Sequence, residues 1–528
     1  MRRWNGWGHA AVSYPLPETA AAVLAEKIGP GAPPRDVSLN TVVASVPPSR
    51  LPPHPLVSTA PELRVRHARG QSFPDLITLR SGRVPAFPDG VALPHHSEEV
   101  RALFDYAREA GARLIPYGGG TSVVGHVNVE PGDAPILTVS LERLQQLHSL
   151  SEEDRLATFG AGVRGPQLEE ALKARGYTLG HFPQSFELST LGGWVVTRSR
   201  GQQSLGYGRI ENLFVGGRLE SPAGTVVLPP FPASATGPDV RELVLGSEGR
   251  MGILTEATVR ITPRPEREEF HALFFPDWER ARTAVRELVQ SGAPLSMLRL
   301  STPEETAINL ALSGHPRLVG FLSGALALRG VRQGGSMLVL GVSGSERAVA
   351  HGWRMALDIA GGHGAVRMPM LGQKWLKGRF RAPYLRNAAW ERGWGVDTVE
   401  TATTWSNLPR LLAAVEEALR GALSDRGERV LAFTHLSHVY PTGSNLYTTF
   451  LFRLGPDAEE THARWRALKT AASRALVAHG ATISHQHGVG TDHRPWLEAE
   501  KGAIGLEAIR HVLKAFDPTG LLNPGKLV

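Results

Sequence analysis

Ile115-Pro-Tyr-Gly-Gly-Gly-Thr-Ser122 follows a short predicted strand and contains three consecutive glycines. Without Cβ atoms, this backbone can approach a ligand closely and present successive N–H groups, an arrangement that suits a pyrophosphate. A Walker A loop would need a lysine after the glycines, and a Rossmann fingerprint would need GxGxxG at the start of a helix. Neither pattern is present. The segment therefore predicts either a different phosphate-binding loop or a tight turn without a ligand.

Two further segments, residues 183–198 and 245–258, combine glycines with hydroxyl side chains. In the second of them, Gly246, Gly249 and Gly252 recur at every third position, and a β-branched strand is predicted to follow. Each segment alone is compatible with an ordinary glycine turn. Together with the first segment, they predict that one extended, phosphate-bearing ligand lies along several loops.

Length and composition narrow the class of protein. The chain has 528 residues, for which two or more domains are expected, and it contains no cysteine. Disulfide frameworks, thiolate zinc sites and cysteine nucleophiles are therefore excluded. The formal net charge is +7 and no run of like charges occurs, so we expect no nucleic-acid partner. Because the sequence shows neither an apolar stretch of about 18 residues nor a signal-peptide pattern, we expect a cytoplasmic enzyme.

Hydrophobic spacing predicts interleaved helices and strands in the body of the chain. Val100, Leu103, Phe104 and Ala107 occupy one face of a helix that Ser97 can cap. The other predicted elements are strands at residues 113–116, 136–139 and 156–159 and helices at residues 166–175, 278–291 and 408–423. The proline-rich stretch before them, residues 29–61, predicts an irregular arm or a linker. This pattern indicates an α+β or α/β fold.

The order of the three glycine segments resembles the FAD-binding module of the vanillyl-alcohol oxidase/p-cresol methylhydroxylase superfamily. Residues 516–526, which include Asn523, are similar to the C-terminal return of that module. The resemblance implies an α+β fold: a two-subdomain FAD-binding PCMH-type module with an α/β cap domain and a C-terminal return segment. The implied parts are an N-terminal arm (1–83), the FAD-binding domain (84–264), the cap or substrate domain (265–475) and the return to the FAD domain (476–528).

The same resemblance implies that the first glycine loop surrounds the FAD pyrophosphate and that the other loops line the ribityl chain and the isoalloxazine ring. The residues expected to bind FAD are Pro116, Tyr117, Gly118, Gly119, Gly120, Thr121, Ser122, Gln184, Ser185, Glu187, Ser189, Thr190, Gly192, Gly193, Thr197, Arg198, Glu248, Gly249, Gly252, Ile253 and Asn523. We expect the FAD to be dissociable, since cysteine is absent and nothing ties the nearby His126 to a covalent flavin bond.

A histidine-bearing segment, residues 433–447, separates two branches of this superfamily. D-2-hydroxyacid dehydrogenases of the superfamily carry a His-x-Gly-Asp-Gly-Asn-x-His stretch here, whose histidines help to hold a divalent metal. In this chain Tyr447 replaces the second histidine, and the segment contains no aspartate. His435 and His438 are therefore interpreted as ordinary strand or loop histidines, and no metal site is expected.

Tyrosine at this position resembles the alkyldihydroxyacetonephosphate synthases (alkylglycerone-phosphate synthases), in which it is a proposed acid/base. These ether-lipid enzymes exchange the acyl chain of acyl-dihydroxyacetone phosphate for a fatty alcohol, through a covalent flavin adduct and without net redox change. The resemblance implies that Arg299 is an active-site arginine and that Arg386 and Thr398 bind substrate. Arginine suits a phosphate because its guanidinium forms a bidentate fork.

A second histidine-bearing segment, residues 484–490, differs from both branches. The synthases have three consecutive histidines before Gly-Val-Gly, whereas this chain has His485, Gln486 and His487. Glutamine cannot shuttle a proton at neutral pH. The hydroxy-acid branch has Glu-His-Gly here, so His487 is common to both patterns. We expect His487 to act with Tyr447 on the reacting proton and His485 to tune or orient the site.

The sequence predicts an FAD-dependent enzyme of the synthase type that acts on a small-molecule or lipid-like phosphorylated substrate. The alternative is an FAD-linked oxidase or dehydrogenase of a 2-hydroxy acid, such as D-lactate or glycolate, or of another alcohol. A flavin-binding scaffold without catalysis is a third hypothesis. Trp4 and Trp7, with Arg2 and Arg3, are compatible either with peripheral membrane contact or with packing on the body. A homodimer is also compatible with the sequence.

Overall fold

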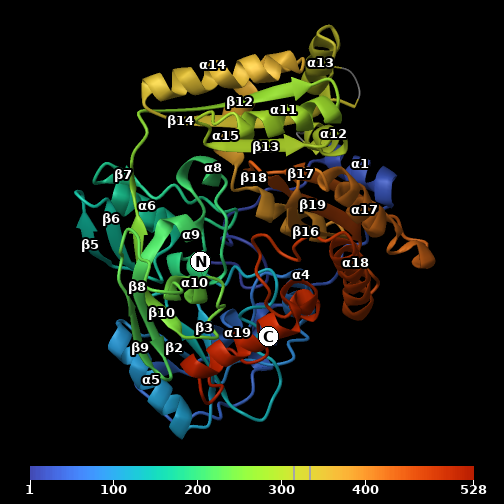
Figure 1. Ribbon diagram of the computed structural model, residues 1–528. Coiled ribbons are helices and arrows are strands. Elements are labelled where there is room, and N and C mark those ends of the chain that lie inside the picture. The colour runs from blue at the N-terminus through green and yellow to red at the C-terminus, as the bar shows by residue number, and fades with distance from the viewer. Residues whose placement is uncertain (313–315, 332–333) are drawn as a thin grey trace.

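The computed structural model describes residues 1–312, 316–331 and 334–528. Its framework consists of a four-stranded, a five-stranded and an eight-stranded sheet, with helices packed around each of them (Figure 1). The two smaller sheets come first along the chain and the eight-stranded sheet follows. The chain then returns to the smaller sheets through α19 (Leu497–Phe516), after which Leu522 pairs with Leu114 in β3. This arrangement has the α+β composition and the C-terminal return that the sequence predicted.

The four-stranded sheet has the order β1-β2-β4-β3, in which β1 is antiparallel to β2 and the other pairs are parallel. Its strands are β1 (Val57–Ser58), β2 (Gly90–Ala92), β3 (Arg113–Tyr117) and β4 (Ile136–Ser140). Against it packs α5 (Ser97–Glu109), whose buried side chains include Val100, Leu103, Phe104 and Ala107. The helix predicted from that spacing and the two strands predicted beside it are confirmed.

The five-stranded sheet is antiparallel and has the order β5-β6-β10-β8-β9. Its strands are β5 (Leu147–Ser151), β6 (Leu156–Gly160), β8 (Phe214–Ser221), β9 (Gly224–Leu228) and β10 (Ile253–Arg260). The strand predicted after the third glycine segment is β10, which begins directly after Gly252. Two helices, α6 (Gly165–Lys173) and α7 (Leu191–Val196), share one apolar cluster with this sheet.

The eight-stranded sheet is antiparallel throughout, and its path runs β15-β12-β14-β13-β17-β19-β16, with β18 paired to β19. Its strands are β12 (Arg267–Phe275), β13 (Met297–Ser301), β14 (Ser336–Gly344), β15 (Val366–Met368), β16 (Trp394–Thr404), β17 (Leu431–Leu436), β18 (Val439–Tyr440) and β19 (Gly443–Arg453). Strands that are far apart in the sequence, such as β13 and β17, are therefore neighbours in space.

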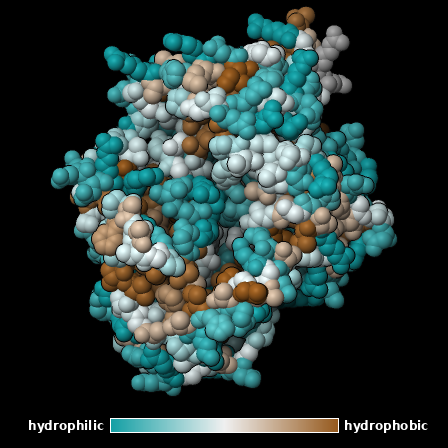
Figure 2. All heavy atoms as spheres, viewed as in Figure 1, coloured by the Kyte–Doolittle hydropathy of each residue, from teal (hydrophilic) through white to brown (hydrophobic). Residues whose placement is uncertain are grey.

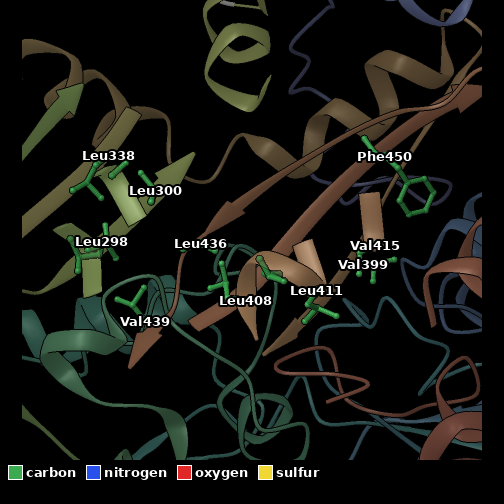
Figure 3. Packing of buried hydrophobic residues seen from close by; sticks show 14 of the residues in the cluster. Leu298, Leu300, Leu338, Val399, Leu408, Leu411, Val415, Leu436, Val439 and Phe450 are labelled. Carbon is green, nitrogen blue, oxygen red and sulfur yellow. The ribbon is translucent and has the colours of Figure 1, made fainter. Parts of the chain in front are cut away.

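One face of this sheet is a hydrophobic core. The helices that share this core include α11 (Trp278–Gln290), α14 (Glu346–Gly362), α17 (Leu408–Gly421) and α18 (Ala458–Ala478). Leu300, Leu436 and Phe450 from the strands and Leu411 and Val415 from α17 belong to a single buried cluster (Figure 3). Side chains alternate along a strand, so the residues between these are directed to the opposite face. The helices predicted at 278–291 and 408–423 are confirmed as α11 and α17.

The N-terminal arm is more ordered than its proline content predicts. Its helices are α1 (Glu18–Ile28), α2 (Leu39–Ala44), α3 (Pro61–Arg66) and α4 (Phe73–Ser81). Within the proline-rich stretch, α2 forms because Ser38 caps it, its Oγ accepting from the Thr41 N–H at 3.2 Å. Trp7 is 5% exposed and packs with Leu188 and Tyr384. Of the two alternatives for the first residues, the structure therefore shows packing on the body for Trp7.

The remaining elements connect these parts. They are α8 (Ser204–Tyr207), α9 (Ile210–Leu213), α10 (Val240–Val244), α12 (Pro303–Leu312), α13 (Pro316–Ala327), α15 (Pro369–Gly378), α16 (Leu385–Trp390), β7 (Tyr177–Thr178), β11 (Thr262–Pro263) and three 3-10 turns (Ala382–Tyr384, Ser424–Arg426 and Arg494–Trp496). Hydrophilic residues cover most of the face seen in Figure 2, with separate hydrophobic patches between them. In the part of the chain that is described, no helix is both long enough and apolar enough to cross a bilayer.

Candidate active site

A large cavity lies between the glycine segments and one face of the eight-stranded sheet. Its volume is about 430 Å³, within the usual range for small-molecule sites. Gly119, Gly193 and Gly249, one from each glycine segment, all line it. Three segments that are far apart in the sequence therefore meet at one place.

Most of the residues expected to bind FAD line this cavity. They are Pro116, Tyr117, Gly118, Gly119, Gly120, Thr121, Ser122, Gln184, Ser185, Ser189, Thr190, Gly192, Gly193, Thr197, Glu248, Gly249, Gly252, Ile253 and Asn523. Glu187 and Arg198 do not line it, because both side chains bind other parts of the protein. Glu187 accepts from the Tyr384 hydroxyl at 3.2 Å, and Arg198 pairs with Glu242 at 2.7 Å.

The first glycine loop is held in place through its backbone. A Cβ atom on Gly119 would lie 2.0 Å from the carbonyl oxygen of Leu188, so a larger residue does not fit. Arg2 donates from Nη1 to the Gly119 carbonyl at 2.6 Å and from Nη2 to the Gly120 carbonyl at 2.9 Å. The N–H groups of residues 119–122 have no acceptor within the described chain. The loop thus directs its carbonyls to Arg2 and keeps its N–H donors free for an anion.

Glu248 joins the third glycine segment to the C-terminal return. Its carboxylate accepts from the N–H groups of Val489 at 2.6 Å and Gly490 at 2.8 Å, and it lies 3.1 Å from Nε2 of His126. Its backbone carbonyl accepts from Nδ2 of Asn523 at 2.7 Å. These contacts hold the return segment against the cavity.

The polar atoms of the cavity suit a flavin dinucleotide. Gln184 Oε1, Gln486 Oε1 and Asn523 Oδ1 are buried acceptors without a hydrogen-bond partner among the described residues. Buried polar atoms rarely stay unpaired in a protein. These acceptors match the N–H and hydroxyl donors of an isoalloxazine ring and a ribityl chain, and the free N–H groups of residues 119–122 match a pyrophosphate. The residues present therefore fit FAD.

Strand register places the candidate catalytic residues on one face of the eight-stranded sheet. Glu400 on β16 pairs with Tyr447 on β19, Tyr447 pairs with His435 on β17, and His435 pairs with Ser301 on β13. Arg299 precedes Ser301 by two positions and shares its face. Because the opposite face is the hydrophobic core, the row from Glu400 to Ser301 is directed to the cavity side.

Tyr447 lines the cavity between two histidines. Its ring stacks on His435 with the centroids 4.9 Å apart, and it meets the edge of His487 at 5.8 Å. Burial raises the pKa of the Tyr447 phenol, while the Thr398 hydroxyl and the charge of Arg386 act in the opposite direction. The phenol is therefore protonated at neutral pH and can donate a proton to a bound molecule.

Arg299 is held by a buried carboxylate. Its Nη2 lies 2.7 Å from Oε1 of Glu305, which also lies 2.9 Å from Nδ1 of His435, and its Nη1 donates to the Ser301 hydroxyl at 3.1 Å. Burial would raise the pKa of Glu305, but the charges of Arg299 and His435 and their hydrogen bonds lower it to about 2. The carboxylate thus stays ionised and fixes the direction of the guanidinium in the cavity wall.

Arg386 is held in the same way. Its Nη2 forms an ion pair with Asp397, and its Nη1 donates to the Gln71 carbonyl at 2.5 Å. The second oxygen of Asp397 accepts from the indole N–H of Trp465 at 2.7 Å. Both candidate arginines therefore carry a buried carboxylate partner, and each keeps its side chain at the cavity wall.

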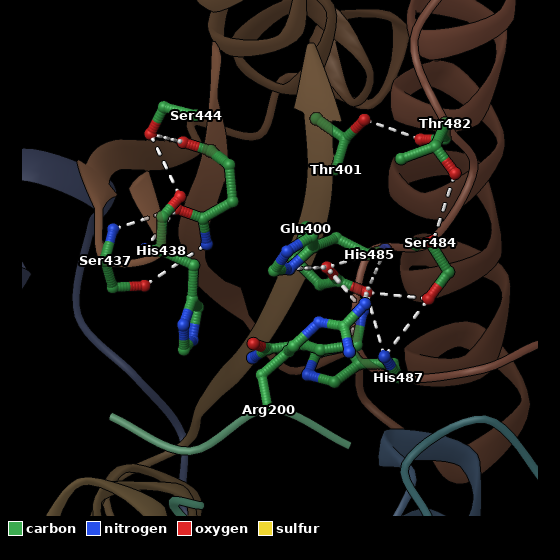
Figure 4. Close-up of polar contacts among 12 residues, drawn as sticks. Arg200, Glu400, Thr401, Ser437, His438, Ser444, Thr482, Ser484, His485 and His487 are labelled. Atoms are coloured by element: carbon green, nitrogen blue, oxygen red, sulfur yellow. Dashed lines mark hydrogen bonds and ion pairs between the residues drawn. The ribbon is translucent and has the colours of Figure 1, made fainter. Parts of the chain in front are cut away.

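Glu400 organises the second histidine segment. Its carboxylate accepts from the N–H groups of His485 at 2.9 Å, Gln486 at 3.1 Å and His487 at 3.0 Å, and from the Ser484 hydroxyl at 2.7 Å (Figure 4). Burial would raise the pKa of Glu400, but the two histidines, the hydroxyl and the N–H donors lower it to about 2. One ionised side chain on β16 therefore sets the shape of the whole loop.

The two histidines of this loop occupy different environments. Burial lowers the pKa of His487, which lines the cavity, while Glu400 acts in the opposite direction. His485 does not line the cavity. Its Nε2 shares a hydrogen bond with the Tyr440 hydroxyl at 2.6 Å, and burial lowers its pKa to about 4. Both imidazoles are therefore neutral at pH 7, and only His487 can contact a ligand in the cavity directly.

The histidines of the first segment bind other side chains of the protein. His438 lies with its Nδ1 3.3 Å from the Ser204 hydroxyl, and His435 binds Glu305 and Arg299. In residues 1–312, 316–331 and 334–528, no group of three or more histidine, cysteine, aspartate or glutamate side chains is arranged to hold a metal ion. Both histidines instead belong to protein networks.

Sequence reasoning missed the carboxylates that hold the site. Asp397 and Glu400 are the only charged residues of β16, and a charged residue in such a strand signals a buried pair. Glu305 gave no comparable signal, because it follows Glu304 in the first turn of α12, where acidic residues are common. The structure shows that Glu305 is only 2% exposed. Gln71 and Arg200, which also line the cavity, lie outside every motif that we singled out.

Comparison with known proteins agrees with this geometry. A family model described as an FAD binding domain matches residues 88–228, and one described as the C-terminal domain of FAD linked oxidases matches residues 264–527. The chain belongs to the FAD-linked oxidase family. FAD is accordingly its cofactor, and the chain is an FAD-dependent enzyme.

One relative and two solved structures show which members of this family and which known folds the chain is similar to. The alkyldihydroxyacetonephosphate synthase of Dictyostelium discoideum is 30% identical over 473 residues, which cover 88% of this chain and 77% of that protein. A solved alkyldihydroxyacetonephosphate synthase is 25% identical and superimposes with a TM-score of 0.84, over 100% of this chain and 99% of the other. A p-cresol methylhydroxylase structure has a TM-score of 0.68 at 13% identity, over 92% and 95% of the two chains. The fold of this chain is therefore the α+β, PCMH-type FAD-binding fold.

Proposed function

We propose that this enzyme exchanges the acyl chain of acyl-dihydroxyacetone phosphate for a fatty alcohol, as its similarity to alkyldihydroxyacetonephosphate synthases suggests. The ester loses its fatty acid and the alcohol takes its place, so no net oxidation occurs. The observation that carries the proposal is the position of Tyr447, a buried phenol at the cavity wall between His435 and His487. The metal-binding histidine of the hydroxy-acid branch would occupy that position.

The bound flavin supplies the covalent or redox centre of the reaction. The chain supplies the proton at the phenol oxygen of Tyr447, whose pKa is raised by burial. The neutral imidazole of His487, 5.8 Å from that ring between centroids, accepts a proton. Tyr447 and His487 are thus the acid and the base of the proposed reaction.

Arg386 and Arg299 orient the anionic head group in this proposal. Asp397 and Glu305 already balance their charges, so the two guanidiniums bind an anion through directed hydrogen bonds more than through net charge. Thr398, which lines the cavity beside Tyr447, completes the substrate-binding set. Because buried carboxylates fix both guanidiniums, little side-chain entropy is lost when the substrate binds.

Apolar residues of the same cavity suit a lipid-like substrate. Met297, Phe433 and Val396 come from the cavity face of the eight-stranded sheet, and Trp375 comes from α15. An acyl or alkyl chain would bury its methylene groups against these side chains. Peripheral membrane contact would supply such a substrate, but Trp7 is not available for it because it is buried. The cytoplasmic location, the homodimer and the domain boundaries stay predictions.

A direct assay tests the proposal. The FAD-saturated protein is incubated with acyl-dihydroxyacetone phosphate and a labelled long-chain alcohol, and the labelled ether product and the released fatty acid are quantified. We expect both products in equal amounts. In parallel, the protein is mixed without oxygen with D-lactate or glycolate, and the flavin absorbance should not change. Bleaching of the flavin by a hydroxy acid, with no ether product, would instead establish the oxidase alternative.

Gln486 is the observation that favours the oxidase alternative, and for this reason the assay includes the hydroxy acids. Its Oε1 is a buried acceptor in the cavity where the synthases have a histidine. The amide can bind substrate or flavin donors but cannot transfer a proton. If His487 and Tyr447 handle both proton transfers, the exchange reaction proceeds without a histidine at position 486.

A further inference from the structure

A second cavity, of about 180 Å³, lies beside the first glycine loop. Its charged wall consists of Arg2, Arg3, Arg66, Arg69, Arg164 and Glu142. These residues come from the N-terminal segment, from the end of α3 and the turn after it, and from loops next to β4 and α6. Five arginines and one glutamate around so small a space create a strongly positive site.

Carboxylates compensate only part of this charge. Arg66 pairs with Glu62 at 2.7 Å, and Arg69 lies 3.6 Å from Glu130. Among the described residues, no carboxylate lies within ion-pair distance of Arg2, Arg3 or Arg164. With Glu142 also in its wall, the cavity therefore carries an excess of positive charge.

Arg69 provides the most specific feature of the cavity. Its side chain is 5% exposed, yet its Nε and Nη2 have no hydrogen-bond partner in the described chain. Elsewhere in this protein, Arg50 and Arg453 use the same Nε and Nη2 edge to bind Asp89 and Glu428 through two parallel hydrogen bonds. The unpaired edge of Arg69 is thus a buried fork of the kind that binds oxyanions.

The cavity is distinct from the site of the FAD pyrophosphate. Gln71, Tyr117 and Gly118 border both cavities, but the carbonyls of Gly119 and Gly120 are directed to Arg2, which lines only the smaller one. Carbonyl oxygens repel a phosphate, whereas the N–H groups of residues 119–122 attract it. The dinucleotide therefore occupies the large cavity, and the arginine-lined cavity needs its own anion.

We propose that the arginine-lined cavity binds a small phosphate-type oxyanion, either free phosphate or the phosphoryl end of a phosphomonoester. The anion accepts from the unpaired edge of Arg69 and balances the charges of Arg2, Arg3 and Arg164. Arg66 donates to the Arg2 carbonyl at 3.1 Å, so the same anion also stabilises the N-terminal segment against the glycine loop. Occupancy of this cavity consequently strengthens FAD binding.

Binding measurements on the FAD-saturated protein test the proposal without any turnover. Inorganic phosphate and glycerol 3-phosphate are titrated separately by calorimetry at constant ionic strength, with chloride as the reference anion. We expect saturable binding of one phosphate per chain that depends on Arg69 and Arg164, separate from any phosphate held by Arg299 and Arg386 in the large cavity. Comparable affinity for glycerol 3-phosphate would identify a phosphomonoester as the ligand, and exclusion of it would identify free phosphate.

Three variants make the test specific. Arg69→Gln and Arg164→Gln should each weaken phosphate binding by about tenfold or more, since a hydrogen bond to a charged group is worth more than about 1.4 kcal/mol. Arg260→Gln, which removes an exposed arginine at the end of β10, should leave the affinity unchanged. Arg164 is only half-buried, so its variant stays informative if Arg69→Gln does not fold. Absence of saturable binding, or equal loss in all three variants, would overturn the proposal.

Discussion

Tyr447 is the residue on which the proposed proton transfer depends. Tyr447→Phe keeps the ring that stacks on His435 and removes only the hydroxyl. We expect turnover to fall by about a hundredfold or more, the usual contribution of a general acid, while FAD stays bound. Steady-state product formation and flavin absorbance after gel filtration measure the two effects.

Tyr177→Phe is a matched control, because Tyr177 lies on the short strand β7 away from the cavity. That variant should retain full turnover. If Tyr447→Phe also retained full turnover, the phenol would have no part in the mechanism.

Glu400 controls the shape of the histidine loop through its negative charge. In Glu400→Gln the side chain keeps its size, but its amide places hydrogens among N–H groups that need an acceptor. We expect the free energy of unfolding to fall by about 1.5–3 kcal/mol, the range for hydrogen bonds to a charged group. Urea denaturation followed by fluorescence measures this change.

Glu153→Gln serves as the comparison, since Glu153 is exposed in the turn between β5 and β6. Surface changes of this kind usually alter stability by less than about 0.5 kcal/mol. Equal stability of the two variants would show that Glu400 does not hold the loop.

At the residue scale, sequence analysis could propose Tyr447, Arg299, Arg386 and His487 because each stands in a motif that resembles a family pattern. The structure places all four at the same cavity. The sequence could flag Asp397 and Glu400 as buried charges, but it could not say which groups they and Glu305 bind, because these contacts join elements whose packing the sequence does not reveal. Glu305, for example, meets His435 across 130 positions of the chain.

At the scale of elements, the close packing of the first glycine loop predicts that a substitution in it weakens FAD binding. Gly119→Ala would bring a Cβ within 2.0 Å of the Leu188 carbonyl oxygen, which belongs to the backbone and cannot turn aside. The loop must shift, and such shifts cost about 1–3 kcal/mol. We expect FAD to bind about tenfold more weakly or worse, as measured by fluorescence titration of the apoprotein.

Gly132→Ala is the control within the same domain, because nothing lies within 4 Å of its added Cβ. It should bind FAD as the unmodified protein does. If Gly119→Ala bound FAD equally well, the loop would not approach the cofactor as closely as we infer.

Local elements were predictable where one face of the element is apolar. The helix α5 follows from the spacing of four buried side chains, and β10 follows from a β-branched run after a glycine segment. By contrast, α2 was missed because a single cap at Ser38 outweighs the surrounding prolines. The strand order of the eight-stranded sheet was not predictable either, since it joins β13 to β17 across many intervening residues.

At the scale of the whole molecule, buried histidines govern the response to acid. Burial lowers the pKa of His181 to about 3 and those of His485 and His493 to about 4. In the unfolded chain these groups bind protons near pH 6.5, so the unfolded state takes up more protons than the native state below that pH. The free energy of unfolding should therefore decrease as pH falls from 6.5 to 4, by up to about 1.4 kcal/mol per pH unit for each histidine.

Several buried carboxyls oppose this trend. Burial raises the pKa of Asp492 to about 6, and it also raises those of Asp75, Glu169 and Glu416, so their contributions favour the native state as pH falls. The buried histidines with a lowered pKa outnumber these carboxyls, since burial also lowers the pKa of His271 to about 4 and those of His67, His435, His438 and His487. Glu305 and Glu400, with pKa values of about 2, lose their contribution only below about pH 4.5. Urea midpoints measured at constant ionic strength across pH 4–7 check the prediction. A midpoint that is constant or rises toward pH 4 would contradict it.

The strands of the eight-stranded sheet carry core residues on one face and cavity residues on the other, and this restricts which sequence changes the enzyme can accept during evolution. Leu446 is buried in the apolar cluster, while its neighbour Tyr447 lines the cavity. An insertion or deletion of one residue within β19 would invert every side chain beyond it, moving the phenol into the core and a leucine into the site. Catalysis and folding would be lost in the same event. New specificities can therefore arise by point substitution on the cavity face or by longer connections between strands. Insertion or deletion of a single residue within a strand is excluded, because it would exchange the two faces of that strand.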